Sequence, residues 1–258
     1  MPSPSPSQSA LGKVPELTLL FWIIKIVATT LGETAGDAVT MSMDLGYLVG
    51  TAIFLAIFIV AVTAQIRASQ FHAPLFWFVV VATTTAGTTL ADFFDRSLGI
   101  GYAGGATLLA LLLAGSLWWW SRALGSVSIK RIASRPAEVF YWMTIMFSQT
   151  LGTALGDWFA DPEKGLGLGY QGSALVFAAG LAVIAALYFW TRVSRTALFW
   201  SAFILTRPLG AAVGDFLDKP VVNGGLAMSR YAASACLALF IIACIVLVRQ
   251  RAERIESD

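Results

Sequence analysis

The chain has 258 residues, of which 57% are hydrophobic and only 12% are charged, and its mean hydropathy is +0.75. Soluble domains carry about 25% charged residues, so this composition excludes an ordinary soluble enzyme, a disordered chain and a disulfide scaffold, and indicates an integral membrane protein. The formal net charge of +2 is too small to indicate nucleic-acid binding, and we expect none.

Eight apolar runs are long enough to cross a bilayer as helices, which takes about 20 residues each. They cover approximately residues 16–39, 46–66, 74–94, 102–121, 137–159, 170–191, 197–217 and 230–248. The Pro- and Ser-rich start predicts a disordered tail over residues 1–13, and residues 251–258 form a C-terminal tail. We therefore predict one all-α membrane domain over residues 14–250 with eight transmembrane helices.

The two sides that these spans define differ in charge. The side of both termini carries eleven Lys and Arg residues, and the connections on the opposite side carry four, which are Arg96, Lys164, Lys219 and Arg230. Because basic loops stay in the cytoplasm, we expect a multi-pass protein of the plasma membrane with both termini cytoplasmic. The opposite, outer side carries ten of the fifteen acidic residues, so we expect an acidic outer face.

The four odd-numbered runs share one pattern, in which an aromatic residue and a Trp are followed by an Asp fifteen residues after the Trp. The four stretches read FWIIKIVATTLGETAGD, FWFVVVATTTAGTTLAD, YWMTIMFSQTLGTALGD and FWSAFILTRPLGAAVGD. Each unit contains a pair of helices, so every copy inserts in the same orientation. We predict four parallel two-helix repeats, approximately 16–66, 74–121, 137–191 and 197–248, related by an axis along the membrane normal.

With these motifs the chain resembles the bacterial "uncharacterised membrane-anchored protein" family, which is defined by four tandem two-helix repeats with a characteristic Trp. The resemblance covers residues 14–248. It implies the topology and a bacterial inner-membrane location. The repeat of that family is named for its unknown function, so the resemblance implies no activity.

Small residues recur at a four-residue spacing in the odd-numbered helices. The pairs are Gly32/Gly36, Gly87/Ala91, Gly152/Gly156 and Gly210/Gly214. Because such pairs let membrane helices approach closely, we predict helix-packing seams that bring the ends of these helices together. The repeated Trp22, Trp77, Trp142 and Trp200 predict an interfacial belt on the inner side.

Each odd-numbered helix carries an Asp near its outer end, at Asp37, Asp92, Asp157 and Asp215. Fifteen residues of helix span about 22 Å, which puts these carboxylates inside a core of roughly 30 Å, towards its outer edge. Ionisable residues are costly there and are functional candidates. We predict cation-binding or proton-coupling groups; the alternative is that they cap helix ends. Asp95 and Asp218, three residues further on, are expected to be solvated.

The first and fourth repeats add three more ionisable residues. Glu33 lies one turn before Asp37, Lys25 two turns before Glu33, and Arg207 two turns before Asp215. We predict that Arg207 pairs with Asp215 or a neighbouring carboxylate, and that Lys25 pairs with Glu33 or a neighbour. The alternative for Lys25 is that it snorkels to the cytoplasmic interface.

Carboxylates beside hydroxyl-rich helices suit hard cations such as Mg²⁺, Ca²⁺ and Mn²⁺, so Glu33, Asp37 and Asp215 form a candidate metal site. The sequence offers little for catalysis, since it has one His, at His72, and no phosphate-binding loop, HExxH motif or GxSxG motif. We therefore expect neither an enzyme nor a cofactor.

The leading hypothesis is a secondary transporter or channel for a small cation, with divalent metal ions among the candidates. The expected partners are the lipid bilayer and the cation or proton. The alternative is a non-transporting membrane scaffold or accessory subunit.

Overall fold

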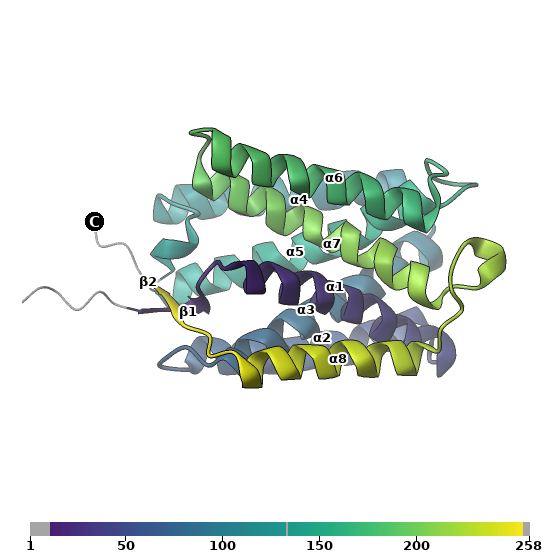
Figure 1. The fold of residues 1–258 in the computed structure, drawn as a ribbon, viewed down its shortest axis with the longest axis horizontal. Coiled ribbons are helices and arrows are strands. Elements are labelled where there is room, and N and C mark those ends of the chain that lie inside the picture. The colour runs from purple at the N-terminus through teal and green to yellow at the C-terminus, as the bar shows by residue number, and fades with distance from the viewer. Residues whose placement is uncertain (1–10, 133, 255–258) are drawn as a thin grey trace, which may run out of the picture.

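The computed structural model describes residues 11–132 and 134–254, which form a bundle of eight long helices (Figure 1). The helices are α1 (Leu19–Asp37), α2 (Gly46–Arg67), α3 (Ala73–Asp92), α4 (Tyr102–Leu124), α5 (Arg135–Ala160), α6 (Gly169–Trp190), α7 (Arg195–Asp218) and α8 (Arg230–Leu247). The π-helical turns η1 (Ala38–Ser42) and η2 (Phe93–Ser97) continue α1 and α3. The prediction of an all-α fold with eight helices is confirmed.

Hydroxyl side chains cap the N-termini of several of these helices. Thr18, Ser134, Ser194 and Ser229 each accept a hydrogen bond from the backbone N–H three residues further on, at the first turn of α1, α5, α7 and α8. Such bonds satisfy a donor that has no partner within the helix. Gly125 directly follows α4 and caps its C-terminus, with a φ of 75° in the left-handed region that favours glycine.

The odd-numbered helices α1, α3, α5 and α7 form a closed inner ring, in which α1 and α5 each pack against both α3 and α7. The even-numbered helices lie outside the ring: α2 packs on α3, α4 on α5, α6 on α7, and α8 on α1. Each outer helix therefore packs on the inner helix of the next repeat, and the last outer helix packs on the first inner one. The four repeats are parallel and pseudo-fourfold.

Burial separates the two sets of helices. The helices α1, α3, α6 and α8 each contain an apolar stretch of 18 residues. In α1 and α3, 61% and 67% of this stretch is buried inside the protein, whereas only 11% is buried in α6 and in α8. The outer helices thus present their apolar side chains outward, as expected of an integral membrane protein. Within the described residues, seven helices are long and apolar enough to cross a membrane. The eighth, α5, buries polar residues such as Ser148 and Gln149 in the ring.

Glycines allow the inner helices to approach closely. A Cβ added to Gly210 on α7 would lie 2.9 Å from a backbone carbon of Thr29 on α1, and one added to Gly87 on α3 would lie 3.0 Å from the backbone of Gln149 on α5. The same arrangement recurs around the ring and one turn later. The further pairs are Gly32 with Thr84, Gly152 with Arg207, Gly36 with Thr88, Gly156 with Ala211, and Gly214 with Glu33.

The first and last described segments of the chain meet at one end of the bundle, which we call the termini end. There β1 (Leu11–Pro15) pairs with β2 (Ala252–Arg254) in an antiparallel sheet. Val14 is buried in the core, and Lys13 forms an ion pair of 2.6 Å with Glu138 on α5. These contacts correct the disordered tail predicted over residues 1–13, because residues 11–13 belong to β1; residues 1–10 lie outside the described residues.

The arrangement predicts which connections share a side of the membrane. Reporter fusions after Arg67, Arg131, Arg195 and Arg254 are expected to report one side, and fusions near Gly99, Gly167 and Asn223 the opposite side. A protease-accessibility or alkaline phosphatase reporter measures this directly. One reversed position would contradict the eight-helix count.

The glycine contacts predict a difference between two alanine substitutions. Gly210→Ala is expected to lower the stability of the protein in detergent by about 1–3 kcal/mol, because the added methyl group overpacks the α1–α7 contact. Gly115→Ala on the outer helix α4 is the control, since a Cβ there meets nothing within 4 Å. Intrinsic tryptophan fluorescence during heating measures both, and equal melting curves would contradict the close contact.

Candidate functional site

The inner ring gathers the four repeated aspartates at the end of the bundle opposite to the termini end, which we call the aspartate end. Asp37, Asp92, Asp157 and Asp215 are between 1% and 6% exposed. Their four helices finish at this end, and the glycine contacts hold the helices close. Each carboxylate is therefore largely removed from solvent and needs a positive partner.

Two cations bridge the four aspartates in pairs. In η2, Arg96 Nε lies 3.0 Å from Asp92 Oδ1 and Arg96 Nη2 lies 3.3 Å from Asp157 Oδ2. Directly after α7, Lys219 Nζ lies 3.1 Å from Asp215 Oδ1 and forms a second ion pair with Asp37 Oδ2. Each cation lies four residues after the Asp of its own repeat and also pairs with the Asp of the next repeat in the ring. The two bridges are therefore related by a pseudo-twofold axis.

Neither bridging role was predicted, because the apolar runs put both residues in outer connections. The signal that could have found them is the spacing of four residues between Asp92 and Arg96 and between Asp215 and Lys219, which puts acid and base on one helix face. The other two repeats have Met41 and Asp161 at that position. Burial alone would lower the pKa of Lys219, but the charges of Asp215 and Asp37 raise it well above its usual value.

A further cation corrects the expectation for Asp218. Asp218 is buried rather than solvated, and its Oδ2 accepts a hydrogen bond of 2.7 Å from Arg230 Nε. The same Arg230 Nε lies 3.9 Å from Asp37 Oδ2. Asp95 is half-buried. The α8 helix thus adds its first residue to the charge network of the aspartate end.

One turn deeper, Arg207 on α7 pairs with Glu33 on α1, the neighbouring carboxylate, rather than with Asp215. Arg207 is fully buried, and its Nη2 lies 2.9 Å from Glu33 Oε2. The same nitrogen donates to the hydroxyls of Thr88 on α3 and Thr153 on α5. One guanidinium therefore connects all four helices of the inner ring.

The predictions for Lys25 are corrected. Lys25 is fully buried, its Nζ lies 4.1 Å from the ring centroid of Phe203, and it has no hydrogen-bond partner among the described residues. It neither pairs with Glu33 nor snorkels to an interface, because its side chain points into the ring against the aromatic residue at the equivalent position of α7. The ring face of Phe203 provides a cation–π contact instead.

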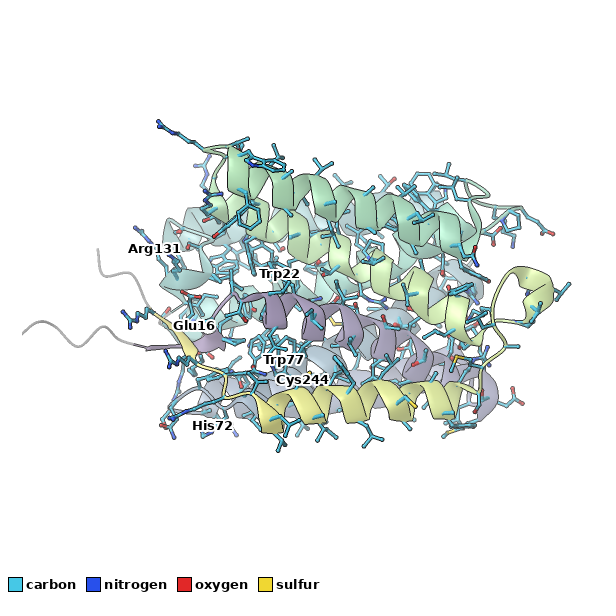
Figure 2. The ribbon with its side chains drawn as sticks, in the orientation of Figure 1. Glu16, Trp22, His72, Trp77, Arg131 and Cys244 are labelled. Carbon is cyan, nitrogen blue, oxygen red and sulfur yellow. The ribbon has the colours of Figure 1, made fainter. Side chains whose placement is uncertain are left out.

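The prediction of an interfacial Trp belt is also corrected. Trp77, Trp142 and Trp200 are buried and Trp22 is half-buried, although all four lie towards the termini end, where Figure 2 labels Trp22 and Trp77. In every repeat an aromatic residue stands directly before the Trp in the sequence. Each Trp contacts this aromatic residue of the repeat before its own, and Trp22 of the first repeat contacts that of the fourth. These pairs are Trp22–Phe199, Trp77–Phe21, Trp142–Phe76 and Trp200–Tyr141, with ring centroids 5.5–6.3 Å apart. We call these eight residues the aromatic layer, and they close the inner ring.

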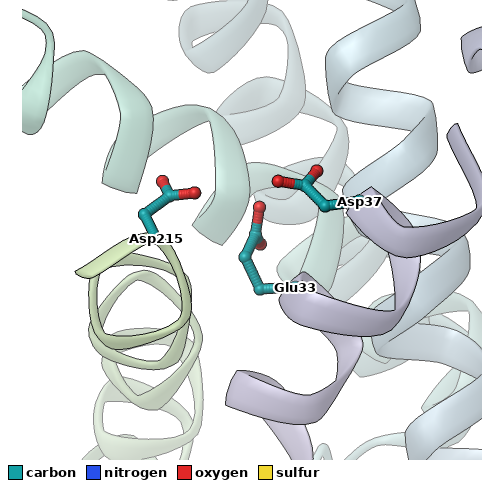
Figure 3. Close-up of side chains that lie close together, drawn as sticks. All are labelled: Glu33, Asp37 and Asp215. Atoms are coloured by element: carbon teal, nitrogen blue, oxygen red, sulfur yellow. The ribbon is translucent and has the colours of Figure 1, made fainter. Parts of the chain in front are cut away.

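Three carboxylates of the aspartate end come together as a possible cation site. Glu33 and Asp37 on α1 and Asp215 on α7 each offer one oxygen, and the three oxygens lie within 4.8 Å of one another (Figure 3). All three residues are buried. Asp37 Oδ1 has no hydrogen-bond partner within residues 11–132 and 134–254. Asp92 and Asp157 lie outside this group and form ion pairs with Arg96 instead. Carboxylate oxygens in this number suit a hard divalent cation.

The comparisons with known proteins give a family for the repeats. A family model described as "Repeat of Unknown Function (DUF347)" matches the chain four times, over residues 20–71, 75–125, 140–194 and 198–254. These four matches coincide with the four helix pairs of the structure. No curated protein and no solved structure matches the chain.

The buried pair of Glu33 and Arg207 predicts strong energetic coupling. Arg207→Met alone is expected to destabilise the protein by about 3–5 kcal/mol, because it leaves the Glu33 carboxylate buried without its partner. Glu33→Gln combined with Arg207→Met is expected to be more stable than Arg207→Met alone. Melting temperatures of both single variants and the double variant measure the coupling, with Arg122→Met as an exposed control. Additive effects would contradict the pair.

Proposed function

Since the chain belongs to the family of the Repeat of Unknown Function (DUF347), whose description assigns no activity, we propose from the geometry that it is a secondary transporter or channel for a small cation. Glu33, Asp37 and Asp215 form the proposed cation site. The observation that carries the proposal is the convergence of these three buried carboxylates, from two adjacent helices of the inner ring, within 4.8 Å.

The charge of the network supports this proposal. The described part of the aspartate end and the turn below it contain six buried carboxylates, which are Glu33, Asp37, Asp92, Asp157, Asp215 and Asp218. The ion-paired cations that face them in the described residues are four, namely Arg96, Arg207, Lys219 and Arg230. Uncompensated buried charge is costly, so this excess of carboxylates favours binding of a cation or of protons.

Polar groups deeper in the ring support movement along its axis. Below the aspartates lie Glu33, Thr88 and Thr153, and one turn further lie Thr84, Gln149 and Arg207. Thr84 Oγ1 and both polar atoms of Gln149 are buried without a hydrogen-bond partner among the described residues. The aromatic layer then closes the ring, so the proposed path ends at a barrier. A closed barrier favours a gated transporter over an open pore.

The proposal includes an orientation. In a bacterial inner membrane with both termini on the cytoplasmic side, the aspartate end faces outward. Its acidic residues would concentrate cations there. The lipid bilayer and the cation or proton are then the partners, with no cofactor, catalytic activity or nucleic acid involved.

The second candidate is a membrane scaffold, and the ion pairs favour it. Arg96, Arg207 and Lys219 each connect neighbouring helices, and such contacts could hold the ring together with no cargo at all. In that case the carboxylates act only through their ion pairs, and substitutions at the aspartate end change stability but no flux.

A flux assay separates the two candidates. Asp37→Asn and Asp215→Asn keep the side-chain volume but remove a ligand charge, so each is expected to lower cation uptake into proteoliposomes at least tenfold. Uptake is measured across a panel of Mn²⁺, Mg²⁺, Ca²⁺, Na⁺ and K⁺, with and without a pH gradient. Asp44→Asn is the control, because Asp44 is exposed at the same end and its φ of 54° also suits Asn.

The outcome that rejects the transporter is equally concrete. If the wild-type protein moves none of these cations, or if both Asn variants move the same cation as fast as Asp44→Asn, the carboxylates serve only the structure. The scaffold would then be the better reading.

A further inference from the structure

We propose that the ammonium group of Lys219 is a tethered cation that occupies the cargo's place, so that the cargo enters by displacing it. This inference rests on the proposed cation site and assigns Lys219 as its competitor. In this role Lys219 is not a ligand of the cargo, because its ammonium group has three N–H donors and no atom that can bind a cation.

The first argument is the position of the Lys219 ammonium. Lys219 Nζ pairs with Asp37 Oδ2 and lies 3.1 Å from Asp215 Oδ1, so it contacts two of the three carboxylates of the proposed site. The other oxygen of Asp37 is buried and has no hydrogen-bond partner in the described part of the chain. A cation bound by Asp37 and Asp215 would therefore lie against the ammonium and compete with it for the same two carboxylates.

The second argument is that Lys219 lies on a connection and not within a helix. It is the first residue after α7 and precedes Pro220 and the exposed turn η4 (Val221–Asn223). Its backbone is fixed by a hydrogen bond of 2.9 Å from its N–H to the carbonyl of Asp215. The side chain is 10% exposed, at the mouth of the ring. In this proposal the flexible four-carbon stem turns the ammonium out to solvent while the backbone stays in place.

The third argument comes from the pseudo-twofold mate of Lys219. Arg96 bridges Asp92 and Asp157 with two different nitrogens of one planar group, whereas Lys219 bridges Asp37 and Asp215 with a single nitrogen. The Arg96 half also lacks a third carboxylate, because Thr88 and Thr153 occupy the positions equivalent to Glu33. A rigid fork holds its two acids more firmly than a point charge does. The ring thus has a fixed half and an exchangeable half.

The charges of the competitors give the expected selectivity. A divalent cation brings two positive charges to carboxylates that the ammonium supplies with one, so it gains more Coulomb energy at the same distance. A monovalent cation gains no such advantage over the ammonium and also lacks its hydrogen bonds. Displacement of Lys219 therefore favours a divalent over a monovalent cargo.

Equilibrium binding of Mn²⁺ to the purified full-length protein in detergent tests this role. Bound Mn²⁺ loses the sharp electron paramagnetic resonance signal of the free aqueous ion, so titration gives the dissociation constant. Lys219→Met removes the competitor and is expected to bind Mn²⁺ at least tenfold more tightly than the wild type. Arg96→Met is the matched control, and it is expected to leave Mn²⁺ binding within about threefold of the wild type.

A second variant covers poor folding of Lys219→Met. Lys219→Arg keeps the positive charge but supplies a fork that holds Asp37 and Asp215 together, so it is expected to bind Mn²⁺ at least threefold more weakly than the wild type. Unchanged or weaker binding by folded Lys219→Met, tighter binding by Lys219→Arg, or an equal gain in Arg96→Met would each overturn the proposal.

Failure of this inference is distinguishable from failure of the cation site itself. If the wild type binds Mn²⁺ and Asp37→Asn loses it while Lys219→Met gains nothing, the cation site stands and the role of Lys219 is wrong. If neither the wild type nor Lys219→Met binds Mn²⁺, a divalent cation site at these carboxylates and the competitor role are both wrong.

Discussion

A carboxylate held inside a membrane-spanning bundle needs positive charge beside it, and this constraint orders the whole aspartate end. Glycine contacts bring four helices so close that Asp37, Asp92, Asp157 and Asp215 meet at one level. Their mutual repulsion would open the ring unless cations lay between them. Arg96 and Lys219 do so in pairs, and the helices that carry the acids are thereby also held together by them.

The symmetry of the molecule falls in steps from the backbone to the charges. Glycine, Trp and Asp recur in all four repeats, and they build the fourfold ring and its aromatic layer. In the part of the chain that the structure describes, the bridging cations occur only in the second and fourth repeats, which makes the charge network twofold. Glu33 and Arg207 occur once each, in the first and fourth repeats. Residues shared by all repeats thus explain the fold, and the unshared ones distinguish one pair of aspartates from the other.

The sequence predicts features that depend on local periodicity, and fails where a side chain's neighbours decide. Eight apolar runs and the interval from Trp to Asp suffice for the helices and the four repeats. The same interval predicts how deep Trp77 lies but not where its side chain points. The side chain of Trp77 faces Phe21 in the ring rather than lipid. The partners assigned to Lys25 came from its own helix, whereas ring closure places Phe203 of α7 against it. Lys219 was counted only as a loop charge.

Lys25 shows why ring packing alone does not explain the polar interior. The equivalent positions of the other three repeats hold Val80, Ile145 and Phe203, all buried, so apolar side chains fill this level of the ring without difficulty. Apolar replacement of buried charges is often neutral or stabilising in proteins. A lysine at this level therefore costs stability that the fold does not require. Together with Arg207 it continues the ionisable groups from the aspartate end towards the aromatic layer, so the polar interior of the ring extends further than helix packing requires.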